Sequence, residues 1–479
     1  MRTIVLLVLM IGSQTECLLA QAHKQGINWV LGFAPVLTMD FGQTPPVVDT
    51  TEFLTGLTYG NSCISDTSGR LQVFTNGFYV FDQDAKVIPG GEKVNTPKGI
   101  KLFDYYSGDG FWHQMSLILP KKNNQYYVFT TGMSDGAFDD WKVTQTDFRF
   151  DVLTYHVVDM DANNGQGEVV EKNKILMQDA YLSHNRMSAV RHANGRDWWL
   201  VKPHRNEQKF YLFLVQPDTI LGPVTRQVNF NMDSIPIQFG IYGVRGQLSF
   251  SPNGEWMAST EAGYGGVFVY HFDRCNGDLS KYHFYKQPWM DTTLEDFSTA
   301  HCFSPNNQLL YLINGANIWQ YDLADTTANS AIHISGPDTV LSHFPRYSLS
   351  YLAPNEKIYI GAFHGIRKTM PFIEFPNIRG LGCGFRGRGN GAFSQPYTNL
   401  VVPPNMPHYT LGAAMGSACD TIKPAIAALP QLNPLVLPDA ITANNDGRND
   451  SWHILNLSAL EQAGLEVSEV IVYNRWGQA

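Results

Sequence analysis

The chain has 479 residues, of which 44% are hydrophobic and 13% aromatic, and a formal net charge of −9. Charged residues make up only 16%, whereas 42 glycines and 26 prolines supply many turns. This balance favours an all-β protein with a large core over a helical enzyme. The absence of a basic excess argues against nucleic acid as a partner.

Residues 1–22 have the pattern of a signal peptide. Arg2 supplies a positive start, residues 4–11 form an apolar core, and Ala20-Gln21-Ala22 forms a small-x-small cleavage site. The apolar core is shorter than the roughly 20 residues that cross a bilayer, and no later segment looks like a transmembrane helix. We therefore expect an exported protein, at the cell surface or extracellular. A buried N-terminal helix or strand is the alternative.

A turn followed by an apolar strand recurs between residues 23 and 419. Proline sets the first turn position, and Asn or Gly accepts the next conformation at little cost. The three clearest turns are Ser251-Pro252-Asn253-Gly254, Ser304-Pro305-Asn306-Asn307 and Ala353-Pro354-Asn355-Glu356; weaker copies end at Gly69, Asn124 and Gly195. The six turns follow one another at steps of 55, 71, 59, 53 and 49 residues. A period near 50 predicts a β-propeller with about four short strands per blade.

Six turns account for six blades, and we expect seven, with six or eight as alternatives. The remaining ends, residues 28–41 and 370–411, are predicted to share the seventh blade and so close the ring without a long exposed edge strand. The longest step predicts an insertion around residues 133–150. A series of β-sandwich modules would need linkers about every hundred residues, and no such linker precedes residue 420.

Five cysteines lie outside the signal peptide: Cys63, Cys275, Cys302, Cys383 and Cys419. An exported protein with five cysteines favours two disulfides and one free thiol. We favour the pairs Cys275–Cys302 and Cys383–Cys419. No CxxC spacing of a zinc site is present.

The composition changes at residue 420. Residues 420–438 carry four prolines and predict an extended linker. Residues 439–479 have the character of a separate small β-domain of sandwich type, of which the sequence contains the beginning.

Two segments of this C-terminal part resemble one known family. Residues 441–452 resemble the opening motif, and residues 470–478 a later strand, of the type B sorting domain of the type IX secretion system, the gliding-motility-associated C-terminal domain of Bacteroidetes proteins. The matching motif residues are Asn444, Asp446, Gly447, Asn449, Asp450, Asn474, Arg475, Trp476 and Gly477. Ala443, Asn445 and Trp452 depart from the family's usual Pro, Gly and Phe, and the family continues beyond the position of Ala479, so the domain is expected to be incomplete.

The upstream region also resembles the propellers that accompany this sorting domain, which are of the WD-repeat and YVTN type. The similar segments are residues 28–32, 64–71 and 192–199. The resemblance implies an exported protein that uses the type IX secretion machinery as a partner. It implies no activity, because propellers carry many unrelated functions.

Few residues of the sequence fit the pattern of a catalytic, metal-binding or ligand-binding site. Asn444, Asp446, Asn449 and Asp450 place oxygen atoms at alternate positions beside a glycine, a pattern that calcium loops use, so calcium is the one cofactor considered. His184, His192 and His204 lie near one another in sequence and could meet at a propeller mouth, although structural histidines are commoner. Residues 382–391 form a glycine-rich segment that we interpret as a surface loop, since no helix pattern follows it.

We expect binding of a protein or glycan partner through loops on one face of the ring, rather than catalysis. Trp112, Trp141, Trp289 and Trp319 are either stacking platforms for such a ligand or core residues, and the core is the commoner place for each of them. A propeller glycan lyase or hydrolase is an alternative that requires carboxylates or a Tyr/His pair in the central funnel. A scaffold in a cell-envelope or gliding complex is a further alternative.

Overall fold

The structure is a computed structural model with two compact units, His23–Thr421 and the combination of Met1–Ala22 with Ile422–Ala479. It describes residues 7–12, 24–32, 36–51, 56–57, 59–106, 112–145, 148–205, 208–229, 246–261, 265–288, 299–314, 317–326, 330–335, 346–363, 370–387, 402–421 and 466–472.

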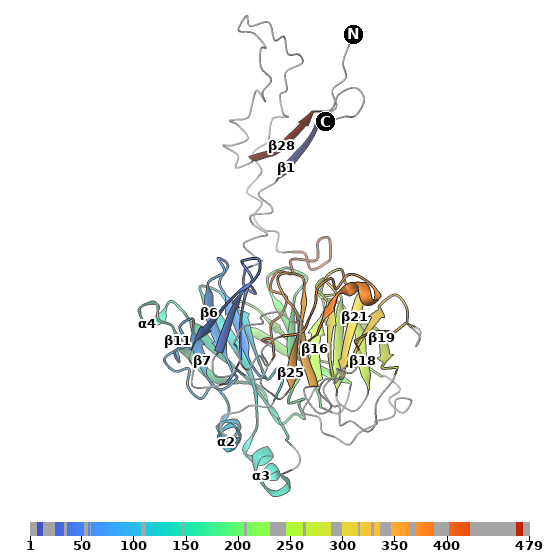
Figure 1. Ribbon diagram of the computed structural model, residues 1–479. Coiled ribbons are helices and arrows are strands. Elements are labelled where there is room, and N and C mark those ends of the chain that lie inside the picture. Colours follow the sequence, from blue (N-terminus) through green and yellow to red (C-terminus); the bar gives the residue numbers. More distant parts are fainter. Residues whose placement is uncertain are drawn as a thin grey trace, which may run out of the picture. The chain divides into compact units, whose positions relative to one another are not determined.

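The unit His23–Thr421 is a seven-bladed β-propeller (Figure 1), as the turn spacing predicts. Each blade is one antiparallel sheet whose strands follow one another in chain order. Blades 1 and 2 contain β2 (Asn28–Leu31), β3 (Val36–Asp40) and β4 (Val47–Thr51), then β5 (Ser62–Ser65), β6 (Leu71–Thr75) and β7 (Val80–Asp82). Blades 3 and 4 contain β8 (Ser116–Pro120), β9 (Gln125–Gly132), β10 (Val152–Asp159) and β11 (Glu168–Met177), then β12 (Ser188–Arg191), β13 (Trp198–Pro203), β14 (Lys209–Val215) and β15 (Ile220–Gln227).

The last three blades have four strands each. Blade 5 contains β16 (Gly246–Phe250), β17 (Trp256–Glu261), β18 (Gly266–Phe272) and β19 (Leu279–Lys286). Blade 6 contains β20 (Thr299–Phe303), β21 (Leu309–Asn314), β22 (Asn317–Asp322) and β23 (Ile332–Ser335). Blade 7 contains β24 (Arg346–Leu352), β25 (Ile358–Phe363), β26 (Phe372–Ile373) and β27 (Phe385–Arg386), with the 3-10 helix η2 (Gly380–Cys383) before β27.

The six recurring turns each connect the first and second strands of blades 2 to 7. All six end on a residue in the left-handed conformation: Gly69 at φ 95°, Asn124 at 55°, Gly195 at 75°, Gly254 at 73°, Asn307 at 61° and Glu356 at 59°. Glycine and asparagine adopt this conformation most readily, which explains their recurrence. We call the propeller face formed by these turns the turn face.

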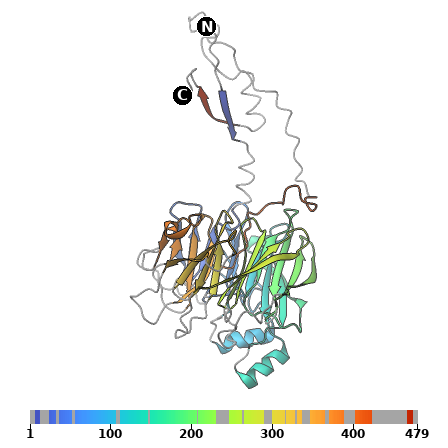
Figure 2. The same ribbon diagram turned by 90° about the vertical axis from the view of Figure 1, so that its right-hand side faces the viewer.

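Two helices project from the opposite face, which we call the helix face (Figures 1 and 2). Helix α2 (Pro97–Tyr105) begins after Thr96, whose hydroxyl accepts a bond from the Gly99 amide at 3.1 Å. Helix α3 (Asp135–Thr144) lies in the predicted insertion and begins after Ser134, which caps it through the Ala137 amide at 3.2 Å. The short helix α4 (Ala162–Gly165) lies between β10 and β11.

The ring closes differently from our prediction that the two chain ends share one blade. Blade 1 consists only of residues from the N-terminal end and blade 7 only of residues 346–386, because each segment has enough strands for a sheet of its own. The two blades meet through side chains: the ring of Tyr359 lies 5.7 Å from both Trp29 and Phe41, centroid to centroid. Aromatic packing therefore closes the ring without a shared sheet.

In the other unit, β1 (Leu7–Gly12) pairs antiparallel with β28 (Glu466–Val472). β1 includes part of the apolar core assigned to the signal peptide, and β28 includes part of the second sorting motif. The predicted linker from residue 422 and the rest of the predicted small domain lie outside the described residues. Among the helices that the structure describes, none has the length and apolar character to cross a membrane.

Candidate functional site

The central channel of the propeller is occupied by the chain itself. Residues 402–409, which we call the channel segment, run between the inner strands from the helix face toward the turn face. At one end, the Asn405 amide donates to the Asn61 carbonyl at 2.8 Å, just before β5. Further along, the Tyr409 hydroxyl donates to the Ile118 carbonyl in the middle of β8 at 2.6 Å.

Asn405 fastens this segment to four blades. Its side-chain amide donates to the carbonyl oxygens of Ser116 at 2.8 Å and Met187 at 3.0 Å. Its side-chain oxygen accepts from Gln114 at 3.1 Å and from the Tyr351 hydroxyl at 3.0 Å. The backbone amide of Asn405 bonds to blade 2, as described above. Every polar group of its side chain and its backbone amide therefore has a partner, although the residue is buried.

Two buried glutamines continue the bridging across the channel. Gln114, before β8, exchanges bonds with the backbone of Leu248 on β16, at 2.9 and 2.8 Å. Gln247 donates to the Ser350 carbonyl at 2.7 Å and accepts from the His301 amide at 3.3 Å. These side chains join blades 3, 5, 6 and 7, so the middle of the channel is a packed polar core.

Residues 410–421, which we call the exit strap, lie on the turn face. Arg191 donates to the Tyr409 carbonyl at 2.8 Å and to the Leu411 carbonyl at 3.2 Å, and Arg274 donates to the Gly412 carbonyl. The Ala414 amide bonds the Ala193 carbonyl at 2.8 Å. The strap is thereby held to blades 4 and 5.

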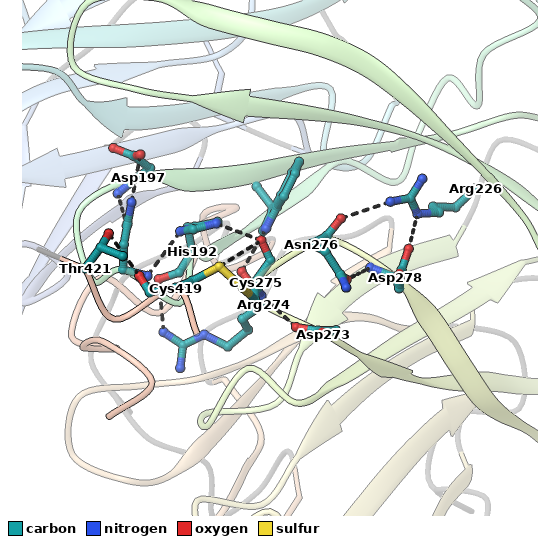
Figure 3. The surroundings of a disulfide bond; sticks show 12 residues. His192, Asp197, Arg226, Asp273, Arg274, Cys275, Asn276, Asp278, Cys419 and Thr421 are labelled. Atoms are coloured by element: carbon teal, nitrogen blue, oxygen red, sulfur yellow. Dashed lines mark hydrogen bonds and ion pairs between the residues drawn. A yellow bond between two sulfur atoms is a disulfide. The ribbon is translucent and has the colours of Figure 1, made fainter. Parts of the chain in front are cut away.

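A disulfide joins the strap to the propeller (Figure 3). Cys419 is bonded to Cys275, which lies between β18 and β19, with Cα atoms 5.5 Å apart. The Cys275 carbonyl lies 2.9 Å from His192 Nε2, and the Cys275 amide donates to Asp273 at 2.7 Å. The disulfide connects residues that are 144 positions apart.

The predicted pairs Cys275–Cys302 and Cys383–Cys419 are therefore wrong. Cys302 lies on the inner strand of blade 6 and Cys383 in η2 of blade 7, and both are free thiols in one apolar cluster. Burial raises the pKa of Cys302 to about 12, so this thiol stays protonated at neutral pH. Cys419 returns to blade 5 only because the chain threads the channel, which spacing in the sequence does not reveal.

A group of cationic side chains lies beneath the helix face. Because β12 ends at the turn face, the residues just before it, His184 and Arg186, lie toward the helix face. The antiparallel partner β13 ends there too, which brings in Lys202 and Arg205. We call these four residues the cationic site.

The two arginines of this site are bonded to the surrounding scaffold. Arg186 donates to the hydroxyls of Ser183 at 3.0 Å and Ser259 at 3.3 Å, and to the Arg205 carbonyl at 3.3 Å. Arg205 donates to the Phe148 carbonyl at 2.9 Å. Blades 3, 4 and 5 thus all contribute to the walls of the site.

The other two residues of the cationic site have almost no partners. Lys202 is 0% exposed, and its single bond runs to the Asn185 carbonyl at 3.5 Å. His184 is also 0% exposed, and neither of its ring nitrogens has a partner among the residues that the structure describes. The side-chain nitrogen of Asn185 has none either, although its oxygen accepts from Ser183 at 2.8 Å. Buried donors without acceptors are rare and call for an explanation.

The electrostatics of the site follow from burial and from its like charges. Burial, with smaller contributions from Arg205, Lys202 and Arg186, holds the pKa of His184 well below its ordinary value. Burial and the charge of Arg186 likewise hold the pKa of Lys202 far below that of a solvated lysine. A bound anion would reverse both shifts, since it favours the charged forms.

No protein-family model matches the chain, and no curated protein does. Among solved structures, a "putative 6-phosphogluconolactonase" of Bacteroides fragilis is 11% identical with a TM-score of 0.42, covering 79% of this chain and 97% of its own. Another so described, from Bacteroides uniformis, is 13% identical with a TM-score of 0.42 over 78% and 97%. The Cps50 (Swd1) propeller domain of Myceliophteria thermophila is 10% identical with a TM-score of 0.41 over 71% and 94%.

The histidines singled out in the sequence separate. His184 and His204 lie toward the helix face, where Arg186 contacts the carbonyl of His204 at 3.4 Å. His192 lies on the turn face beside the disulfide. Within the described parts of the chain, no three His, Cys, Asp or Glu side chains group as metal ligands.

The other predicted site residues fall into two groups. The calcium and sorting residues Asn444, Asp446, Gly447, Asn449, Asp450, Asn474, Arg475, Trp476 and Gly477 lie outside the described residues, as does Trp289. Trp112 and Trp141 are buried in the apolar cluster beneath α2 and α3, and Trp319 stacks on His333 with centroids 4.4 Å apart. These three tryptophans are packing residues.

Sequence reasoning missed both the channel segment and Lys202. A lone lysine in the otherwise apolar run Trp198–Pro203 was a signal, because such a strand buries both of its faces. Asn405 gave no signal of its buried position, since an asparagine among prolines is typical of a surface loop.

Proposed function

We propose that this protein is an exported propeller that binds a protein or glycan partner on its helix face. The observation that carries the proposal is the occupation of the channel and of part of the turn face by residues 402–421. Within the described residues, the ring axis is covered at the turn face, which favours a partner that approaches from the helix face. Tyr105 on α2, 59% exposed, provides an aromatic anchor there.

The partner is identified by screening the full chain against glycans and surface proteins, with turnover of the same glycans followed in parallel. Saturable binding without product supports the proposal, whereas product release favours the glycan lyase or hydrolase.

Two matched variants then locate the binding face. Tyr105→Ala removes an exposed side chain of the helix face, and Met415→Ala removes one of the exit strap that is 88% exposed. We expect Tyr105→Ala to weaken partner binding about tenfold and Met415→Ala to leave it unchanged. The reverse pattern would place the partner on the turn face.

We propose further that the C-terminal motifs direct the chain to the type IX secretion machinery and to the cell surface or medium. The support is the order and spacing of the motif residues 444–450 and 474–477. The test is expression of the full chain in a bacterium with this system and in a mutant that lacks it. Surface or extracellular protein only in the first strain is the expected result; equal distribution in both strains contradicts it.

A further inference from the structure

We infer that the cationic site binds one oxyanionic group, a carboxylate, sulfate or phosphate, between Lys202, His184 and Asn185. The inference is independent of the macromolecular partner, because it concerns a single anionic group beneath the surface. It rests on three neighbouring buried side chains whose hydrogen-bonding capacity is largely unused.

Three neighbouring side chains supply these donors. In its charged form, the side chain of Lys202 has three protons, but its single contact is the long bond of 3.5 Å to the Asn185 carbonyl. The nitrogen of the Asn185 side chain has no acceptor, and neither ring nitrogen of His184, one of which carries a proton in the neutral ring, has a partner. An unsatisfied buried donor costs about 1–3 kcal/mol, so leaving several of them in one place is unfavourable unless an acceptor arrives.

The walls of the site favour an anion over a neutral acceptor. The guanidinium of Arg186 is anchored by Ser183 and Ser259, which fixes a positive charge beside Lys202. A third charge, that of Arg205, acts on His184. No carboxylate forms an ion pair with Lys202 or His184 in the part of the chain that the structure describes. An oxyanion is stabilised by nearby positive charge, by a site of low exposure and by hydrogen-bond donors that have no other acceptor, and this site provides all three.

The test is titration of the full chain with sodium phosphate, sodium sulfate and sodium glucuronate at constant ionic strength, with glucose as the neutral counterpart of glucuronate. Calorimetry gives the dissociation constant, and thermal unfolding gives the shift in Tm. Saturable binding of at least one of the anions, without binding of glucose, is expected. Phosphate or sulfate binding points to a free ion or an ester group, and glucuronate binding alone points to an acidic sugar.

Three variants locate the site. Lys202→Met keeps the length of the side chain without its charge and should raise the dissociation constant at least about tenfold, the loss expected for a charged hydrogen bond. Asn185→Asp places a carboxylate in the site, so it should raise the Tm without added anion and abolish the anion-dependent shift. Lys101→Met changes an exposed lysine of α2 and should leave the dissociation constant within about twofold of the parent.

Two results would overturn the inference. One is the absence of a saturable anion effect in the unmodified chain. The other is an equal effect in all variants, which would mean that the anions act elsewhere. Asn185→Asp keeps the test decisive even if Lys202→Met fails to fold.

Discussion

Two regions near the propeller axis differ in how their buried polar groups are satisfied. Around Asn405 and along the exit strap, donors and acceptors meet in pairs, and a disulfide adds a covalent link. Toward the helix face, Lys202 has one long bond, and the side-chain nitrogens of Asn185 and His184 have no partner. A satisfied network stabilises the fold, whereas an unsatisfied one costs stability and points to a ligand. The first region stabilises the fold, and the second is the one in which we propose that an anion binds.

The largest expected loss of stability comes from removing the Asn405 side chain, which is at the centre of the hydrogen-bonded network in the channel. Asn405→Ala leaves Gln114, Tyr351 and two backbone carbonyls without their partner, so we expect the free energy of unfolding to fall by about 3–5 kcal/mol. Denaturant unfolding measures the change. Asn306→Ala, on an exposed turn, is the control and should lower it by less than about 1 kcal/mol. Equal losses in the two variants would mean that the hydrogen bonds of Asn405 stabilise the fold no more than those of an exposed turn.

The second largest expected loss of stability comes from removing the disulfide Cys275–Cys419. Cys419→Ser opens a link between residues 144 positions apart, and we expect a loss of about 2–4 kcal/mol, since the link restricts the unfolded chain. Thermal unfolding with and without reductant measures it. Reductant should destabilise the parent protein and leave the Cys419→Ser variant unaffected; a parent protein insensitive to reductant would contradict the assignment.

Alanine substitutions at two glycines test the contact between the exit strap and the turn face. Gly195 and Gly165 have similar positive φ values of 75° and 81°, but a Cβ on Gly195 would lie 2.9 Å from the backbone nitrogen of Ala413, whereas Gly165 has nothing within 4 Å. Both alanine variants pay about 1 kcal/mol for the left-handed backbone. We expect Gly195→Ala to lose about 1–2 kcal/mol more in denaturant unfolding, because the strap must move. Equal losses would show that the strap is not held there.

The pH dependence of stability tests His156, a buried histidine whose two ring nitrogens both have partners. His156 is buried, its Nδ1 accepts from the Asn173 amide at 3.0 Å and its Nε2 lies 3.2 Å from the Thr130 hydroxyl, so the ring is neutral. Burial, with a smaller contribution from Lys172, lowers its pKa from the ordinary 6.5 to about 3.

The unfolded state therefore binds one more proton than the folded state between these pH values, and stability is lost as the pH falls from about 6.5 toward 3. His156→Gln should flatten the pH dependence of the free energy of unfolding by about 1.4 kcal/mol per pH unit between pH 6 and 4. Denaturant unfolding at several pH values measures the slope. An unchanged slope would mean that His156 does not titrate on unfolding.

Sequence reasoning succeeded where the chemistry is local. The turns that end at Gly254 and Asn307 carry their signal within four residues, because a left-handed position selects glycine or asparagine. The blade count was predicted from six such turns and a seventh blade shared by the two ends of the chain; the count is confirmed, although the N-terminal strands form a blade by themselves. The assignment of Cys275 failed, because any cysteine can pair with any other that the fold brings near.

The candidate site was only partly predictable. His184 and His204 were singled out, but neither their separation from His192 nor the presence of Lys202 was foreseen. A side chain's burial depends on what covers it, and that cover comes from blades 3, 4 and 5, which are distant in the sequence.

By itself, the sequence determined the all-β class, the propeller repeat and the turns that mark it, because each depends on a few neighbouring residues. Only the tertiary structure decided how the ring closes, that residues 402–409 fill the channel, which cysteines pair, and that Lys202 is buried beside His184. These features are contacts between segments separated by up to several hundred residues, such as Ser62 with Asn405. They exist only once the ring has formed, since the closed fold is what brings such segments together.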